Sequence, residues 1–173
     1  MLSSHAVASP QYNSDTGPDE LFVFRTGRQL FAVRASEVAG TAERKVPAKL
    51  PLAPAAVLGV ISVRGRVLTV LDPLAFVNEQ QPEARAIIPF VVILKGDEQL
   101  ALAADRREDS IQVSPDRIRP TSEASVTARS SEQLDSPILG SVQNNDATTI
   151  IVLDPAKLFA AAMGKLERRR RRT

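Results

Sequence analysis

Short apolar segments separated by turn residues predict a chain built mainly of β-strands. Residues 21–25 (LFVFR) and 29–33 (QLFAV) lie on either side of a turn that contains Gly27. This spacing is typical of a tight β-hairpin, because glycine adopts turn conformations that other residues disfavour. Residues 35–41 are then expected to form a short helix, and the proline-punctuated residues 47–54 a loop.

A second pair of apolar segments follows this loop. Residues 57–63 (VLGVISV) precede an Arg-Gly-Arg turn, and residues 67–71 (VLTVL) follow it. By the same spacing rule these segments form a second hairpin, with two arginines at its tip.

The order of these segments returns in the second half of the chain. Residues 90–94 and 99–103 repeat the first hairpin at an offset of 69 or 70 residues, and residues 138–142 and 149–153 repeat the second at 81 or 82. A polar stretch rich in Ser and Thr, residues 121–136, accounts for the growth of the offset and is expected to be an exposed loop insertion. Two copies of one β unit are the simplest organisation of such a sequence.

The repeat predicts a mainly β fold of two similar barrels packed together, with short helices and a C-terminal helix. The first barrel is expected to span about residues 20–85 and the second about residues 86–163. Residues 1–19 have no apolar period and are rich in Ser, Pro, Gly, Asn and Asp, so this N-terminal segment is expected to be disordered. Residues 164–173 form a basic C-terminal tail.

Each half ends in an Asp-Pro pair followed by an apolar helical pattern. Asp72 and Asp154 can accept hydrogen bonds from the first turn of the helix that follows, where proline has no N–H group to leave unpaired. We interpret these aspartates as helix caps and not as catalytic groups, since no metal-ligand spacing accompanies them. The final helix is expected to carry Leu158, Phe159 and Ala162 on one side, to dock on a barrel and to stop at Gly164.

Composition limits the chemistry that is possible. The chain has no cysteine, and its one histidine, His5, lies in the segment expected to be disordered. Disulfides and cysteine nucleophiles are thereby excluded, and a serine nucleophile has no histidine base. The sequence has no secretory signal pattern and no apolar run of about 18 residues, so the expected location is the cytoplasm.

Paired carboxylates are the remaining route to catalysis. Asp105, Glu108 and Asp109 are close in sequence, but Arg106 and Arg107 lie among them, and we expect a solvated mixed-charge turn. No phosphate-binding glycine loop, metalloprotease motif or calcium-loop motif is present. The sequence therefore predicts a protein that is not an enzyme and has no metal or cofactor.

Positive charge is concentrated at the C-terminus. Residues 165–173 carry a net charge of +5, which leaves −3 for residues 1–164 and gives the chain its total of +2. The arginines of this tail are Arg168, Arg169, Arg170, Arg171 and Arg172. A solvated chain end and an electrostatic attraction to nucleic acid or an anionic membrane are the two alternative interpretations.

The tip of the second hairpin is the clearest candidate for a functional patch. Arg64 and Arg66 flank Gly65 at the end of an apolar strand pair. Arginine there can offer planar, bidentate hydrogen bonds to a carboxylate or a backbone carbonyl of a partner. An ordinary solvated turn is the alternative interpretation.

Residues 59–72 (GVISVRGRVLTVLD) resemble the CheW-domain pattern, in which G-V-I-N-L-R-G is followed by an apolar strand that ends in aspartate. Further matches in the expected order are residues 22–33, Pro54, residues 102–105 and residues 138–159. The resemblance covers about residues 20–163. It implies two SH3-like five-stranded barrels and a non-catalytic adaptor or scaffold.

The resemblance also implies partners and a place in the cell. Family members join the cytoplasmic tips of methyl-accepting chemoreceptors to the regulatory domain of a CheA-type histidine kinase, and they contact other CheW-like domains. A cytoplasmic location in receptor arrays is thus implied. By the family pattern the receptor groove would comprise Val38, Gly59, Val63, Arg64 and Gly65. Kinase contacts would come from the edge strands of the barrels.

Three positions depart from the family pattern. Gly40 stands where a glutamate is typical, Arg34 where an aspartate is typical, and Ser62 where an asparagine is typical. Loss and reversal of charge near the expected groove change which partner is tolerated. These departures indicate a coupling protein specialised for a subset of the usual partners.

Two other classes of protein are alternatives at this level. A small-barrel nucleic-acid-binding protein would use the basic tail, but such proteins interleave basic residues with exposed aromatics, and only 4% of this chain is aromatic. An enzyme on a β scaffold is the weaker alternative, because nucleophile and metal-ligand patterns are lacking.

Overall fold

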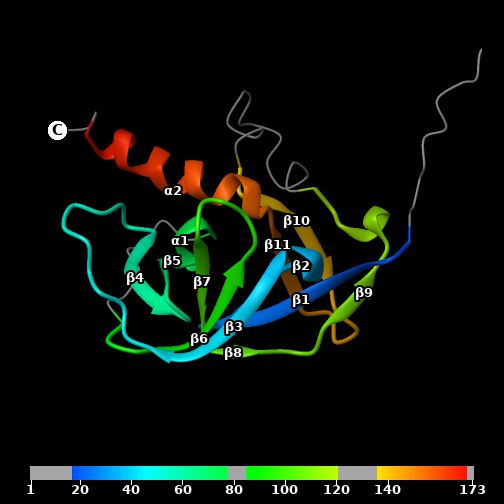
Figure 1. Cartoon of the computed structure of the whole chain (residues 1–173). Helices are drawn as coiled ribbons and strands as arrows, with labels where there is room; N and C mark the ends of the chain where they lie inside the picture. The colour runs from blue at the N-terminus through cyan, green and yellow to red at the C-terminus, as the bar shows by residue number, and fades with distance from the viewer. Residues whose placement is uncertain (1–16, 78–84, 121–135, 171–173) are drawn as a thin grey trace, which may run out of the picture.

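The computed structural model describes residues 17–77, 85–120 and 136–170, with side chains described as far as residue 164. Strands dominate, and they form a six-stranded and a five-stranded sheet (Figure 1). The mainly β class expected from the sequence is confirmed. The strands are β1 (Asp19–Thr26), β2 (Gln29–Arg34), β3 (Val38–Lys45), β4 (Val57–Val63), β5 (Arg66–Leu71), β6 (Ile88–Leu94), β7 (Leu100–Ala104), β8 (Arg106–Arg107), β9 (Ile111–Val113), β10 (Ile138–Gln143) and β11 (Thr149–Leu153). The helical elements are η1 (Ala35–Glu37), α1 (Leu74–Val77), η2 (Pro115–Arg117) and α2 (Pro155–Arg170).

Among the described strands, all neighbours are antiparallel except two pairs. The first sheet has the order β10-β11-β2-β1-β8, and β9 also pairs with β1. The second sheet has the order β3-β6-β7-β5-β4. The parallel pairs are β2 with β11 and β5 with β7. Each sheet therefore combines a hairpin from one half of the chain with strands from the other half.

This pairing corrects the expected division into a barrel of about residues 20–85 and a barrel of about residues 86–163. The β1–β2 hairpin pairs with β8, β9 and β11, whereas β6–β7 pairs with β3 and β5. The two repeats have exchanged their first hairpins. The exchanged strands β1, β6 and β7 contain runs of four or five buried residues, so both of their faces are covered. The exchange explains this burial, because each exchanged hairpin has the core of its own sheet on one face and the core between the sheets on the other.

The second sheet has the expected five strands, whereas the first has six. The additional strand arises after β7, where the chain forms two short strands that both pair with β1. The segment that was expected to be one solvated turn therefore contains β8 and leads into β9.

Each sheet closes through one isolated bridge. Ala48 exchanges two backbone hydrogen bonds with Val60, at 2.8 and 2.9 Å, and so joins the chain beyond β3 to β4. Arg119 exchanges two with Ser141, also at 2.8 and 2.9 Å, and joins the chain beyond η2 to β10. The bridges occupy equivalent places in the two repeats, so the repeat predicted from the sequence extends to the way in which each sheet closes.

Two apolar clusters lie within single sheets. Leu21 and Ile150 belong to a cluster contributed by the first sheet, and Leu68 and Val91 to one contributed by the second. Side chains of successive residues in a strand point to opposite faces. The alternate residues of these strands are consequently free to enter another core.

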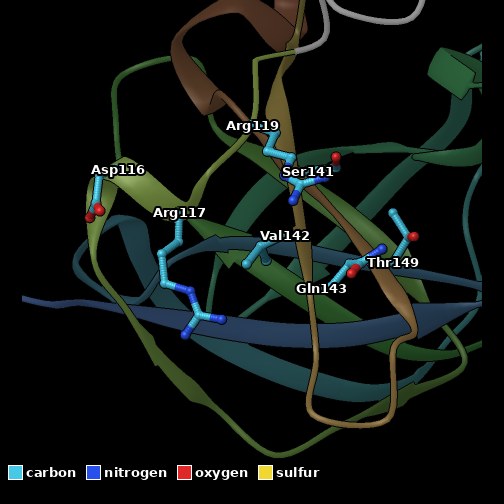
Figure 2. Close-up of a pocket in the computed structure, with 7 residues that line it drawn as sticks. All are labelled: Asp116, Arg117, Arg119, Ser141, Val142, Gln143 and Thr149. Carbon is cyan, nitrogen blue, oxygen red and sulfur yellow. The ribbon is translucent and has the colours of Figure 1, made fainter.

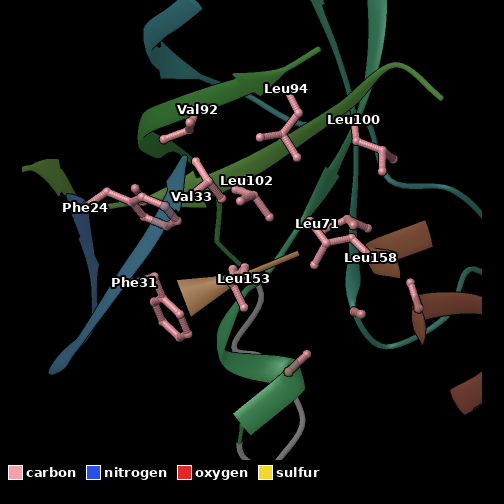
Figure 3. Packing of buried hydrophobic residues seen from close by; sticks show 14 of the residues in the cluster. Phe24, Phe31, Val33, Leu71, Val92, Leu94, Leu100, Leu102, Leu153 and Leu158 are labelled. Atoms are coloured by element: carbon pink, nitrogen blue, oxygen red, sulfur yellow. The ribbon is translucent and has the colours of Figure 1, made fainter. Parts of the chain in front are cut away.

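That other core lies between the sheets and joins them to the helices. It contains Phe24 and Phe31 from the first sheet, Leu102 from the second and Leu158 from α2 (Figure 3). The rings of Phe24 and Phe31 stack with their centroids 6.0 Å apart. Because all these side chains are buried, the two sheets and α2 form one folding unit.

The helices differ from expectation at two places. Residues 35–41 were expected to be helical, but only η1 forms there, and β3 begins at Val38 because it pairs with β6. Gly164 does not end the last helix, since α2 continues to Arg170. Glycine costs about 1 kcal/mol within a helix, and the Lys, Leu, Glu and Arg residues that follow are good helix formers that offset this cost.

The caps expected from the Asp-Pro pairs are confirmed. The backbone N–H of Leu74 donates to Asp72 Oδ1 at 3.0 Å, and the N–H of Ala156 donates to Asp154 Oδ1 at 3.1 Å. Asp72 is almost completely buried, and this burial raises the pKa of its carboxyl, against the Leu74 hydrogen bond and the charge of Arg85, which lower it.

Candidate partner-docking site

The β4–β5 hairpin presents a cationic tip. The last paired residues are Val63 and Arg66, and the turn between them has positive φ at both Arg64 (51°) and Gly65 (77°). Two positive φ angles are characteristic of a type I′ turn, which matches the twist of a hairpin. Arg64 and Arg66 are exposed, and neither forms an ion pair within the described part of the chain. Their guanidinium groups are available to a partner.

Two other residues of the expected receptor groove have internal positions. Val63 is 9% exposed and packs in the core of the second sheet. Gly59 is buried beneath the carbonyl of Ala48, and a Cβ at this position would lie 2.4 Å from that oxygen. Val63 and Gly59 therefore support the hairpin and do not present side chains to a partner.

Val38 lies on β3, whose continuation meets β4 through the isolated Ala48–Val60 bridge. It begins β3, which is at the opposite end of the order from β4, and it packs at the margin of the core between the sheets. The structure places Arg64 and Gly65 at the tip of the hairpin, whereas Val38 lies at the start of β3. A groove made by all the expected residues stays a prediction.

Charge is rearranged near Val38. Arg34 forms an ion pair with Asp19 at 3.2 Å, and a Cβ at Gly40 would have no other atom within 4 Å. Glu37 has a buried Oε2 with no hydrogen-bond partner among the described residues. Burial raises the pKa of the Glu37 carboxyl, Arg34 opposes this shift, and Asp154 adds to it. Sequence reasoning did not single out this buried carboxyl group of Glu37.

Exposed apolar side chains occur in the loop between β3 and β4 and immediately before β6. We define the apolar loop residues as Val46, Leu50, Leu52 and Ile87, which are 69%, 44%, 89% and 47% exposed. Val46 and Ile87 are the next positions of the β3–β6 ladder, whose last pair is Lys45 with Ile88. Leu50 and Leu52 belong to the proline-punctuated loop expected at residues 47–54, whereas Val46 and Ile87 lie outside every segment predicted from the sequence. The pattern gave no sign that these side chains are exposed.

A polar cavity of about 310 Å³ lies between η2 and β10 (Figure 2). Its lining residues are Asp116, Arg117, Arg119, Ser141, Val142, Gln143 and Thr149. Val142 is buried and belongs to the core of the first sheet, whereas Arg117 and Arg119 are exposed. Within the described residues no cluster of three or more metal-ligating side chains occurs. The cavity has neither a paired carboxylate nor a nucleophile–base pair.

The carboxylates after β7 form specific contacts that were not expected. Asp105 accepts hydrogen bonds from the backbone N–H of Gly27 at 2.6 Å and from Arg85 at 2.8 Å. Glu108 pairs with Arg25 at 2.7 Å and with Arg106 at 3.0 Å. The expected solvated turn is thus a structural ion-pair network. The hydrogen bond from Arg25, followed by that from Arg106, lowers the pKa of the Glu108 carboxyl.

Comparison with known proteins places these features in a family. The CheW-like domain model matches residues 20–163. A probable chemotaxis protein CheW of Rhizobium etli is 33% identical over 124 residues, which cover 70% of this chain and 76% of the relative. The chemotaxis protein CheW of Rhizobium meliloti is 33% identical over 105 residues, which cover 61% of this chain and 68% of that protein.

A solved structure shares the fold. The crystal structure of the scaffolding protein TtCheW from Thermoanaerobacter tengcongensis aligns with a TM-score of 0.60 at 18% identity, over 79% of this chain and 89% of that chain.

Across the described residues, no helix combines the length and apolar character needed to span a membrane. With a family match that includes both sheets, their bridges and the start of α2, this chain belongs to the CheW-like domain family.

Proposed function

We propose that this chain is a non-enzymatic coupling scaffold of a chemotaxis-type signalling system. It joins the cytoplasmic tip of a methyl-accepting chemoreceptor to the regulatory domain of a CheA-type histidine kinase. The observation that carries this proposal is the CheW-like match over residues 20–163, which includes both sheets. The names of two relatives and of the structural neighbour, a scaffolding protein, agree with it.

The apolar loop residues are the proposed kinase-docking surface. Leu52 is 89% exposed, and its φ of 58° lies in the left-handed region, which is disfavoured for leucine. The backbone therefore adopts an unfavourable conformation at a residue whose apolar side chain faces solvent. Exposed apolar groups beside the end of a strand ladder fit the docking of one barrel onto another. The family resemblance implies that the regulatory domain of the kinase is itself CheW-like, so a barrel-to-barrel contact is the expected mode of docking.

The tip of the β4–β5 hairpin is the proposed receptor contact. Arg64 and Arg66 have no ion pairs among the described residues, so a receptor carboxylate or carbonyl gains their hydrogen bonds without displacing an internal partner. The ion pair of Arg34 with Asp19 gives the surface beside the start of β3 a charge pattern of its own. Such a pattern favours a subset of receptors, in cytoplasmic receptor arrays.

Nucleic-acid binding is the less favoured alternative. Base stacking requires exposed aromatic side chains beside cations. Within the described residues the exposed large apolar side chains are mainly aliphatic, and Phe159 is the exposed aromatic. The family match also concerns the part of the chain that precedes the basic tail.

Calorimetry with the full chain tests the proposal. The chain is titrated with the kinase regulatory domain and, separately, with a receptor-tip fragment from the same organism. Binding to both is expected. Binding to neither overturns the coupling function.

Matched variants assign the two surfaces. Leu52→Asp is expected to weaken binding to the kinase domain about tenfold or more and to leave receptor binding unchanged, because it places a charge in an apolar interface. Phe159→Asp, another exposed apolar position, is its control.

Arg64→Asn tests the receptor contact. Asparagine tolerates the positive φ of this position but lacks the guanidinium group, so receptor binding is expected to fall and kinase binding to stay unchanged. Arg28→Asn, at the exposed turn of the β1–β2 hairpin, is its control. Equal effects of variant and control contradict the assignment.

A further inference from the structure

Helix α2 has two apolar sides, and only one of them is buried. Leu158 and Ala162 are 0% and 1% exposed and pack in the core between the sheets. Phe159 and Met163 are 43% and 42% exposed. Residues four apart lie on one face of a helix, so Phe159 and Met163 form a stripe beside the buried one.

Beyond this stripe the helix becomes strongly basic. Its backbone continues to Arg170, and residues 165–173 contain six cations and one glutamate. Figure 1 shows the C-terminal end of α2 leading away from the two sheets. The last part of α2 is therefore a cationic arm that continues directly from an exposed apolar stripe.

We propose that α2 binds the surface of an anionic lipid bilayer through Phe159, Met163 and the cationic end of the helix. An apolar stripe enters the boundary between head groups and acyl chains, while a cluster of Lys and Arg is attracted to acidic phospholipids. The apolar stripe alone or the basic cluster alone gives weak membrane binding, and the two together give stronger binding. The helix carries both within about four turns.

Charge and apolar character together favour a bilayer over nucleic acid. Phosphate contacts alone give nucleic-acid binding that depends on the cations and gains nothing from Met163. A bilayer uses both kinds of side chain. The proposal goes beyond the coupling function, because Arg64 and Leu52 lie on other elements and remain accessible.

Co-sedimentation of the full chain with vesicles tests this inference. Vesicles of phosphatidylcholine mixed with phosphatidylglycerol are expected to bind the chain, and pure phosphatidylcholine vesicles are not. Raising the salt concentration is expected to weaken the binding, because salt screens the attraction between tail and head groups.

Two variants separate the contributions. Phe159→Ser with Met163→Ser and, separately, deletion of residues 165–173 are each expected to reduce partitioning about tenfold. Leu52→Ser, an exposed apolar position elsewhere, is expected to have no effect on partitioning. A circular dichroism spectrum identical to that of the parent chain shows, for each variant, that the fold is intact, whether or not vesicles bind.

Three results overturn the proposal. One is the absence of binding to anionic vesicles. Another is unchanged partitioning of the Phe159→Ser, Met163→Ser variant, which leaves an electrostatic tail only. The third is a low-salt gel shift with duplex DNA by a chain that does not bind vesicles, which assigns the tail to nucleic acid.

Discussion

Gly59 and Gly140 occupy equivalent positions in the two repeats, and each lies directly beneath a backbone carbonyl. A Cβ on Gly59 would lie 2.4 Å from the oxygen of Ala48, and a Cβ on Gly140 would lie 2.4 Å from the oxygen of Arg119. Ala48 and Arg119 are the residues that close the two sheets. A side chain at either glycine therefore prevents the close approach on which closure depends.

Alanine at these positions is expected to destabilise the fold. Gly59→Ala combines this clash with φ of +143°, and Gly140→Ala has the clash alone, so we expect losses of about 2–4 kcal/mol, with the larger loss at Gly59. Urea denaturation measures the free energy of unfolding. Gly40→Ala is the control, because an added Cβ there has no other atom within 4 Å. Equal stability of all three variants contradicts this role.

The sequence predicted part of this residue-scale pattern. The repeat places Gly59 and Gly140 in register, and the resemblance singles out Gly59 as a groove residue. The closing contact itself was not predictable from the pattern, since Ala48 belongs to a proline-punctuated loop and its bridge is a single pair outside any strand. Close backbone approach, and not only partner contact, accounts for glycine here.

Strand β8 shows how a very short element is held in place. It has two residues, yet two side-chain contacts tie it and the residue after it to β1, and a third joins Glu108 to β8 itself. The guanidinium of Arg107 lies 4.8 Å from the ring centroid of Phe22, and Glu108 bonds both Arg25 and Arg106. These contacts compensate for a ladder too short to be stable alone.

Glu108 gives this element a pH dependence. Its pKa in the fold lies below the ordinary value of 4.5, so its contribution to stability is present above pH 4.5 and is lost as the pH falls through the lowered pKa. Glu108→Gln is expected to be less stable than the parent by about 0.5–1 kcal/mol at pH 7, and this difference is expected to disappear as the pH falls through the lowered pKa. Denaturation at several pH values measures the difference. Asp109→Asn, at an exposed neighbour, is the control, and a difference for Glu108→Gln that persists at low pH contradicts this explanation.

Strand β3 shows why one element was predicted wrongly from the sequence: residues 35–41 were expected to be helical. Its sequence, VAGTAERK, has a residue spacing compatible with a helix and little β propensity. It forms a strand because the apolar β6 pairs with it from Val38 to Lys45. The hairpins, whose strands are rich in Val, Ile, Leu and Phe, were predicted nearly to their ends, because their own residues favour a pleated, buried surface.

The molecule as a whole is held together by the exchange of hairpins between repeats. Leu30 of β2 lies beside Ile150 of β11, and Thr69 of β5 lies beside Leu100 of β7. A pattern repeated twice is satisfied equally by strands that close within each copy and by strands exchanged between copies. The sequence therefore revealed the repeat, whereas the partners of each hairpin depended on packing that the pattern does not encode.

Fragments test this exchange. A cut between Gln80 and Gln81 keeps Arg85 with its partner Asp105 and separates the repeats. Neither residues 1–80 nor residues 81–173 is expected to show a cooperative unfolding transition alone, because each sheet takes its strands from both halves of the chain. An equimolar mixture is expected to recover the circular dichroism spectrum and binding to the kinase domain. Cooperative unfolding of residues 1–80 by themselves contradicts the exchange.

The parallel pairing of β2 with β11 has a consequence during translation. Ile150 leaves the ribosome only after a further 120 residues have followed Leu30. At roughly 5–20 residues per second, this interval lasts about 6–24 s. During this interval the apolar β1–β2 hairpin lacks its neighbouring strand β11. Synthesis rate and chaperone supply are therefore expected to govern the yield of native protein more strongly than for a chain whose barrels close one after the other.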